Sequence, residues 1–81
     1  MNGISIKDPQ TKSTCGTVTI GPDGTVRLAG FSEELGKVTK NPGGTWAVEL
    51  PDGGTGLQAT RQRALYLLWL ARENRLHAAG R

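Results

Sequence analysis

Cysteine, histidine and aromatic residues are scarce in this chain, and their scarcity excludes several classes of protein. The single cysteine, Cys15, cannot form an intrachain disulfide, and with one histidine, His77, no group has the ligand spacing of a zinc site. The longest apolar run, residues 64–71, is far shorter than the roughly 20 residues of a membrane-spanning helix. We therefore predict neither a disulfide scaffold nor a metalloprotein, and no membrane partner.

The sequence also offers no recognisable catalytic group. The hydroxyl of Ser13 and the thiol of Cys15 have no evident base and orienting partner, which nucleophilic catalysis requires. The glycine-rich stretches 41–45 and 51–56 lack the spacing of a phosphate-binding loop and are typical of tight hairpin turns. A chain of 81 residues leaves little room for a pocket that excludes water. We predict a non-enzymatic protein with no cofactor and no small-molecule substrate.

The first ten residues bear on the compartment. They contain no basic patch followed by an apolar run, as a secretory signal would. Together with the single cysteine, whose role the sequence leaves open, this predicts a cytoplasmic protein.

Residues 1–81 are predicted to form one small domain that begins with β-structure. In residues 1–30, apolar and polar residues alternate in a first strand and in a hairpin around a Gly-Pro-Asp-Gly turn. In residues 37–59, the two glycine-rich stretches separate three further strands, which predicts a three-stranded meander. The connection between them is predicted to be a turn that anchors Phe31 and Leu35 in the core. Whether the first hairpin joins the meander in one sheet is left open.

A helix is predicted over residues 60–79. Thr60 is a good N-cap, and the following residues to 79 include no glycine or proline and many strong helix formers. The sequence therefore predicts an α+β fold. In it, a small antiparallel sheet, built from a β-hairpin and a three-stranded meander, packs against one C-terminal helix.

Positive charge is concentrated in this helix. Residues 1–60 hold five basic and six acidic side chains, whereas residues 61–81 hold five arginines and one glutamate. The whole chain has a formal net charge of +3, so its positive excess belongs to the C-terminal segment. A segment of this kind attracts polyanions or an acidic protein surface. A solvated helix whose arginines keep a small protein in solution is the alternative.

The predicted helix is apolar on more than one side. At about 100° per residue, it carries a stripe of Leu65, Trp69 and Leu76 and a patch of Tyr66, Leu67 and Leu70. A sheet covers one stripe of a helix, so the other side needs the N-terminal hairpin or a partner to cover it. We predict that the stripe faces the sheet and that the patch binds a second copy in a homodimer. Exchanging the two roles suits the sequence nearly as well.

Binding to duplex DNA is the leading functional hypothesis. A small antiparallel sheet can enter the major groove while a helix braces it and arginines contact phosphates. The predicted contacts are basic residues of the sheet and the helix: Arg27, Lys37, Lys40, Arg61, Arg72 and Arg75. Trp46 is expected to point inward, so no aromatic platform for unpaired bases is predicted, which favours duplex DNA over RNA. Such a protein would be a small regulator of the phage or plasmid type.

A protein partner is the second hypothesis. A strand edge or the apolar helix patch could dock on another protein, as in an inhibitor or adaptor. The segment Trp46–Ala71 (W-x-V-x-L-P-D-G…T-R-x-x-A-L) is similar to antitoxin-like and inhibitor proteins that combine a β-meander with one helix. It is equally similar to the three-stranded DNA-binding modules of phage integrases. A pattern shared by two unrelated groups leaves both functions open.

Overall fold

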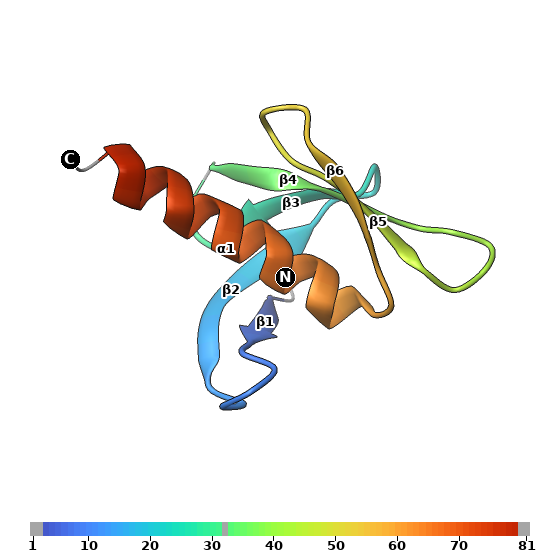
Figure 1. Cartoon of the computed structure of the whole chain (residues 1–81), viewed down its shortest axis with the longest axis horizontal. Coiled ribbons are helices and arrows are strands. Elements are labelled where there is room, and N and C mark those ends of the chain that lie inside the picture. Colours follow the sequence, from blue (N-terminus) through green and yellow to red (C-terminus); the bar gives the residue numbers. More distant parts are fainter. Residues whose placement is uncertain (1–2, 32, 80–81) are drawn as a thin grey trace.

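Six strands pair in chain order into one antiparallel sheet, and a single helix follows them (Figure 1). The computed structural model describes residues 3–31 and 33–79, and only the backbone of 78 and 79. The predicted α+β fold is confirmed for this part of the chain. Its elements are β1 (Ile4–Lys7), β2 (Thr14–Ile20), β3 (Thr25–Leu28), β4 (Glu34–Lys40), β5 (Trp46–Glu49), β6 (Thr55–Gln58) and α1 (Arg61–Ala79).

The N-terminal hairpin and the meander belong to the same sheet. β3 pairs with β4, with Thr25 opposite Lys37, and a β-bulge at Leu35 interrupts the register between Glu34 and Gly36. The connecting turn is shorter than predicted, because β4 already includes Leu35. That side chain is buried as expected, but Phe31 is 69% exposed. Phe31 closes a tight turn, donating its N–H to the carbonyl of residue 28, and therefore has no strand to hold it over the core.

Alternation along the strands gives the sheet two chemically different faces. The inner face packs against α1, and the outer face, on the opposite side, carries mainly threonine and charged side chains. Val48 points inward, whereas its neighbours Ala47 and Glu49 point outward. The buried core combines inner-face side chains with one side of the helix: Ile6, Val18, Val26, Leu35, Val38, Val48, Ala64, Leu65 and Leu68. Burial of these side chains is the main stabilising term of the fold.

The helix faces the sheet with a different set of residues from the one predicted. Leu65 is buried and Trp69 is half-buried against β2, but Leu76 is 53% exposed. Ala64 and Leu68 complete the buried side instead. The reason is visible in Figure 1, where the C-terminal part of α1 extends beyond the strands and leaves its last turns without a sheet to cover them. Only the first three turns of the helix can therefore bury a stripe.

A glutamine side chain from the helix completes the edge of the sheet at β1. The amide of Gln62 accepts a hydrogen bond from Lys7 N at 3.2 Å and donates one to Ser5 O at 2.8 Å. Both backbone groups point away from β2, so the amide takes the place of a neighbouring strand. This pair of bonds fixes the start of α1 beside β1.

Replacing Gln62 with alanine should lower the free energy of unfolding by about 1–2 kcal/mol. Two hydrogen bonds of about 0.5–1.5 kcal/mol each are lost, and water replaces them in part. Chemical denaturation of the full chain measures the change. Gln10→Ala is the matched control, because no hydrogen bond of the Gln10 side chain is found among the described residues. Equal stability of the two variants would contradict the role of Gln62.

Candidate nucleic-acid interface

Basic side chains from two distant segments meet at the start of α1. Lys7 and Lys12, at the end of β1 and in the loop after it, line a hollow of about 260 Å³ together with Arg63. Arg61 is the first residue of the helix and is exposed at the same end. We call Lys7, Lys12, Arg61 and Arg63 the basic end. Of the described residues that line the hollow, Asp8 is the acidic one.

Local hydrogen bonds hold the loop that carries Lys12. The carboxylate of Asp8 accepts bonds from Gln10 N at 2.8 Å and from Thr11 N at 3.3 Å. The backbone N–H of Lys12 donates to Asp8 O at 2.8 Å, and Lys12 has a left-handed φ of 65°. Such a φ is uncommon outside glycine and requires support from the surroundings. The loop therefore presents Lys12 in a defined place.

The charge of Asp8 is itself stabilised by this loop. The backbone N–H of Gln10 makes the largest contribution to a lowered pKa of the Asp8 carboxyl, and bonds from Thr11 and Tyr66 act in the same direction. The Tyr66 hydroxyl donates to Asp8 Oδ2 at 3.4 Å, and burial followed by the nearby Asp8 charge raises the pKa of Tyr66. At neutral pH Asp8 is therefore charged and Tyr66 is a neutral donor.

The start of α1 has an unusual distribution of charge. Thr60 caps the helix, because its hydroxyl accepts a hydrogen bond from Arg63 N at 3.2 Å. The first turn contains no acidic side chain and two arginines. The helix dipole places partial positive charge at this terminus, where cations are disfavoured and anions attracted. The two arginines and the helix dipole thus both contribute positive electrostatic potential at the start of α1.

The six residues predicted to contact DNA lie on different surfaces. Arg27 and Lys37 are on the outer face of the sheet, where Arg27 Nη2 is 4.0 Å from Glu34 Oε1 and Lys37 lies opposite Glu49. Lys40 is exposed at the end of β4. The three helix residues lie on α1, on the other side of the sheet: Arg61, Arg72 and Arg75. The structure brings Arg61, alone of the six, into the basic end.

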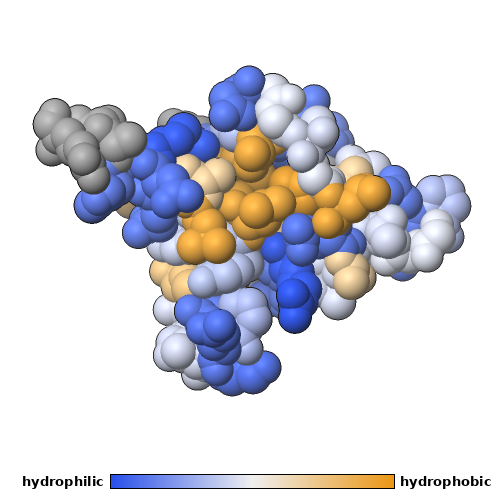
Figure 2. Space-filling model, viewed as in Figure 1, coloured by the Kyte–Doolittle hydropathy of each residue, from blue (hydrophilic) through white to orange (hydrophobic). Residues whose placement is uncertain are grey.

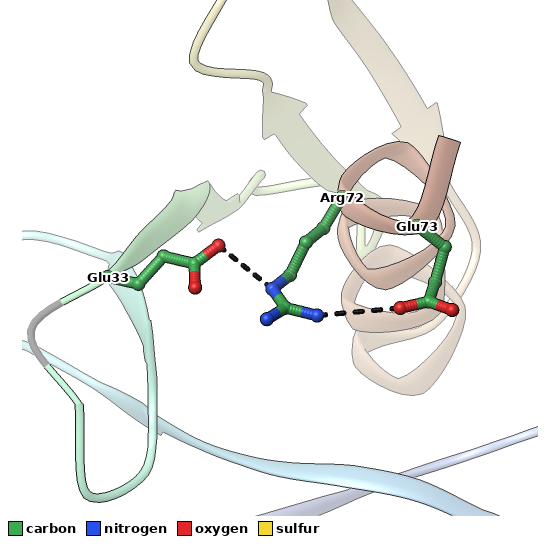
Figure 3. A network of polar contacts seen from close by, with 3 residues as sticks. All are labelled: Glu33, Arg72 and Glu73. Atoms are coloured by element: carbon green, nitrogen blue, oxygen red, sulfur yellow. Dashed lines mark hydrogen bonds and ion pairs between the residues drawn. The ribbon is translucent and has the colours of Figure 1, made fainter. Parts of the chain in front are cut away.

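Arg72 takes part in a network of contacts within the protein (Figure 3). Its Nε donates to Glu33 Oε2 at 2.8 Å, and its Nη1 lies 3.4 Å from Glu73 Oε2. The guanidinium also sits 5.3 Å from the centre of the Trp69 ring. Its side chain is only 17% exposed, whereas Arg75, one turn later, is exposed. Arg72 therefore ties the helix to the turn before β4.

The predicted interface patch is only partly exposed. Tyr66 and Leu67 are half-buried, and Leu70 is 40% exposed. Tyr66 turns toward the loop of Asp8, whereas Leu67, about 100° round the helix, packs over Gly56 of β6. Leu70 lies between the other two round the helix and is the most exposed of the three, so it remains available to a partner.

Sequence reasoning missed Lys7, Lys12 and Arg63 as a group. Lys7 and Gln62 are 55 residues apart, so no local sequence pattern predicts their contact. The available signal was the pair of arginines without an acid in the first helical turn, which breaks the usual rule for helix starts.

Comparison with protein-family models, with curated proteins and with solved structures finds no match to this chain. Among the described residues, no three His, Cys, Asp or Glu side chains gather where they could hold a metal ion. Within the same part of the chain, no helix has the length and apolar character needed to cross a membrane. The assignment of function therefore depends on the surface chemistry alone.

Proposed function

We propose that this protein is a non-catalytic cytoplasmic binding protein that contacts the phosphate backbone of duplex DNA through its basic end, as a small regulator would. The observation that supports this most is the meeting of Lys7, Lys12 and Arg63 around one hollow beside the start of α1. Phosphates bind readily where backbone N–H groups, a helix N-terminus and basic side chains coincide.

The composition of the first helical turn supports the same proposal. Arginines at Arg61 and Arg63 oppose the helix dipole, and a fold selected for stability alone would favour acidic residues there. Positions that break a local rule without a structural gain are frequently functional. A bound phosphate would relieve this repulsion, because it pairs with the arginines and with the helix terminus together.

A duplex fits this surface better than unpaired bases do. Single-stranded nucleic acid is bound by aromatic side chains on which bases stack. The outer face of the sheet, as described, carries threonine, charged residues, Ala47 and Leu57 and no aromatic side chain. Trp46 lies on the inner face, packed against the core. Contacts to the regular phosphates of a duplex need no such platform.

Asp8→Asn should strengthen the binding of duplex DNA about two- to fivefold at low salt, because it removes a nearby negative charge. The lowered pKa of Asp8 means that the wild-type carboxylate opposes phosphate at any pH above its usual value of 3.8. Asparagine retains an oxygen that can accept the Gln10 and Thr11 bonds. Fluorescence anisotropy with a labelled duplex measures the change.

Asp52→Asn is the matched control for this experiment. Asp52 accepts a hydrogen bond from Gly54 N at 2.9 Å in the β5–β6 turn, at the end of β6 farthest from α1. It makes the same change in net charge, so affinity that rises equally in both variants would show a general charge effect and contradict a localised site. No measurable binding in any variant would favour a protein partner instead.

A further inference from the structure

Among the described residues, no strand pairs with the outer edge of β6. Leu50 N donates to Gly54 O at 2.7 Å, which fixes the hydrogen-bonding register of β5 and β6. Gly56 and Gln58 then bond to β5, while the N–H and C=O groups of Thr55 and Leu57 point to the free edge. Among the described residues, no group donates a hydrogen bond to the carbonyl oxygens of Thr55 and Leu57 or accepts one from their N–H groups. A second strand could therefore pair there.

The two edges of the sheet differ in how they are protected. The β1 edge is occupied by Gln62 and ends in a lysine. β6 has the sequence Thr-Gly-Leu-Gln, without charge, proline or bulge, which are the usual means of preventing edge pairing. This edge is thus left open to another strand.

Apolar side chains lie on both sides of the β6 edge. On the outer face Leu57 is 65% exposed and lies opposite Ala47, at a groove of about 590 Å³. On the inner face Leu67 of α1 packs over Gly56, and Leu70, about 60° further round the helix, is 40% exposed. Figure 2 shows a continuous apolar surface that extends from the side of α1 over β5 and β6. A strand added here would bury apolar surface on both faces.

We propose that a second copy of this chain occupies this edge, with two β6 strands pairing antiparallel about a two-fold axis at Gly56. This register sets Thr55 of each copy opposite Leu57 of the other, so all the free groups of both residues pair. Gly56 has no side chain to obstruct the axis. The two Leu57 side chains lie diagonally across it, within reach of each other.

Charge also favours a second copy over a different partner. β6 is uncharged, so two copies meet without repulsion at the pairing strands. The basic end follows the C-terminal end of β6 through only two residues. Antiparallel pairing therefore places the two basic ends at opposite ends of the joined strands, where their repulsion is least. The two α1 helices lie on the same face of the joined sheet, with Leu70 available for contact.

Sedimentation velocity over a concentration series, without DNA, tests the proposal. We expect wild-type protein to reach twice the mass of 8.6 kDa for one chain. Leu57→Lys and Leu57→Pro should each raise the dissociation constant at least tenfold. The proline removes the Leu57 N–H, which faces the free edge, and leaves the hydrogen bonds between β5 and β6 in place, which an edge strand tolerates. Leu76→Lys is the matched control, because Leu76 is also exposed but lies near the end of α1, and it should leave the dissociation constant unchanged.

Amide hydrogen exchange provides a second readout that does not depend on a substitution. In the dimer the amides of Thr55 and Leu57 should exchange slowly at high protein concentration and rapidly on dilution, whereas the amide of Gly56 is protected in both states. A monomer at every concentration would overturn the proposal. A dimer that survives both Leu57 variants but is lost in Leu70→Lys would also overturn it and assign dimerisation to the helix. Neither result bears on DNA binding, because no DNA is present.

Discussion

Replacing Arg61 and Arg63 together with alanine should weaken the binding of every duplex by roughly tenfold at physiological salt. Both arginines belong to the basic end. Each phosphate contact releases a counterion when DNA binds, so the loss of a contact also reduces the number of counterions released. The negative slope of the logarithm of the association constant against the logarithm of salt concentration should therefore decrease in magnitude by about 2. Anisotropy titrations over a salt series measure both quantities.

The double variant Lys40→Ala/Arg75→Ala is its control. It removes the same amount of charge from exposed residues outside the basic end. We expect the control to keep most of the wild-type affinity and salt slope. A larger loss in the control would move the interface to the end of β4 and the distal part of the helix. Unchanged affinity in both double variants would contradict the basic end as the DNA contact.

Gly36→Ala should destabilise the fold by roughly 2–5 kcal/mol, the largest effect we expect from one small substitution. Gly36 has a φ of 146°, a conformation that side chains rarely adopt. A Cβ at this position would meet the carbonyl oxygen of Glu49 and come within 2.6 Å of Leu68 Cδ2. Leu68 belongs to α1 and is fully buried between the helix and the sheet, so neither neighbour can move away without disturbing the contact between helix and sheet. Thermal and chemical denaturation measure the loss.

Gly43→Ala shows whether the loss is specific to this position. Gly43 lies in the β4–β5 turn, and an added Cβ there meets nothing within 4 Å. Its φ lies outside the positive range, so alanine should be neutral or stabilise by about 0.4–1 kcal/mol through the unfolded state. Similar destabilisation in both variants would show that glycine content as such, rather than contact with Leu68, accounts for the effect.

Strands and helix were predictable because their signals are local. Apolar residues alternate with polar ones in β2 and β3, and glycine-rich turns mark the hairpins. Thr60 identified the start of the helix, where its hydroxyl indeed accepts the bond from Arg63 N. The residues from Glu34 to Gly36 were misjudged as a turn because β4 contains a glycine and a bulge, which disturb the period of two.

The buried side of the helix was harder to predict, because α1 is apolar in almost every direction over residues 64–71. At about 100° per residue, Leu68 lies on the same side of the helix as Arg61 and Arg72, so the sequence alone did not indicate that it is buried. The choice depends on where the sheet ends under the helix. Because the sheet ends before the last turns of α1, Leu76 is exposed. Arg72 instead forms an ion pair with Glu33.

The sequence by itself determined the first hairpin, the three-stranded meander, the C-terminal helix and the excess of positive charge at the C-terminal segment, since each follows from neighbouring residues. Only the tertiary structure joined the hairpin and the meander into one sheet. Only the tertiary structure decided which charges act together. Contacts between β1 and α1 bring Lys7 and Lys12 to Arg63, while Glu33 binds Arg72. The same packing closes the β1 edge with Gln62 and leaves the β6 edge unpaired. The physical reason is that surface potential and free hydrogen-bonding groups depend on distances in space, which residue spacing along the chain does not fix.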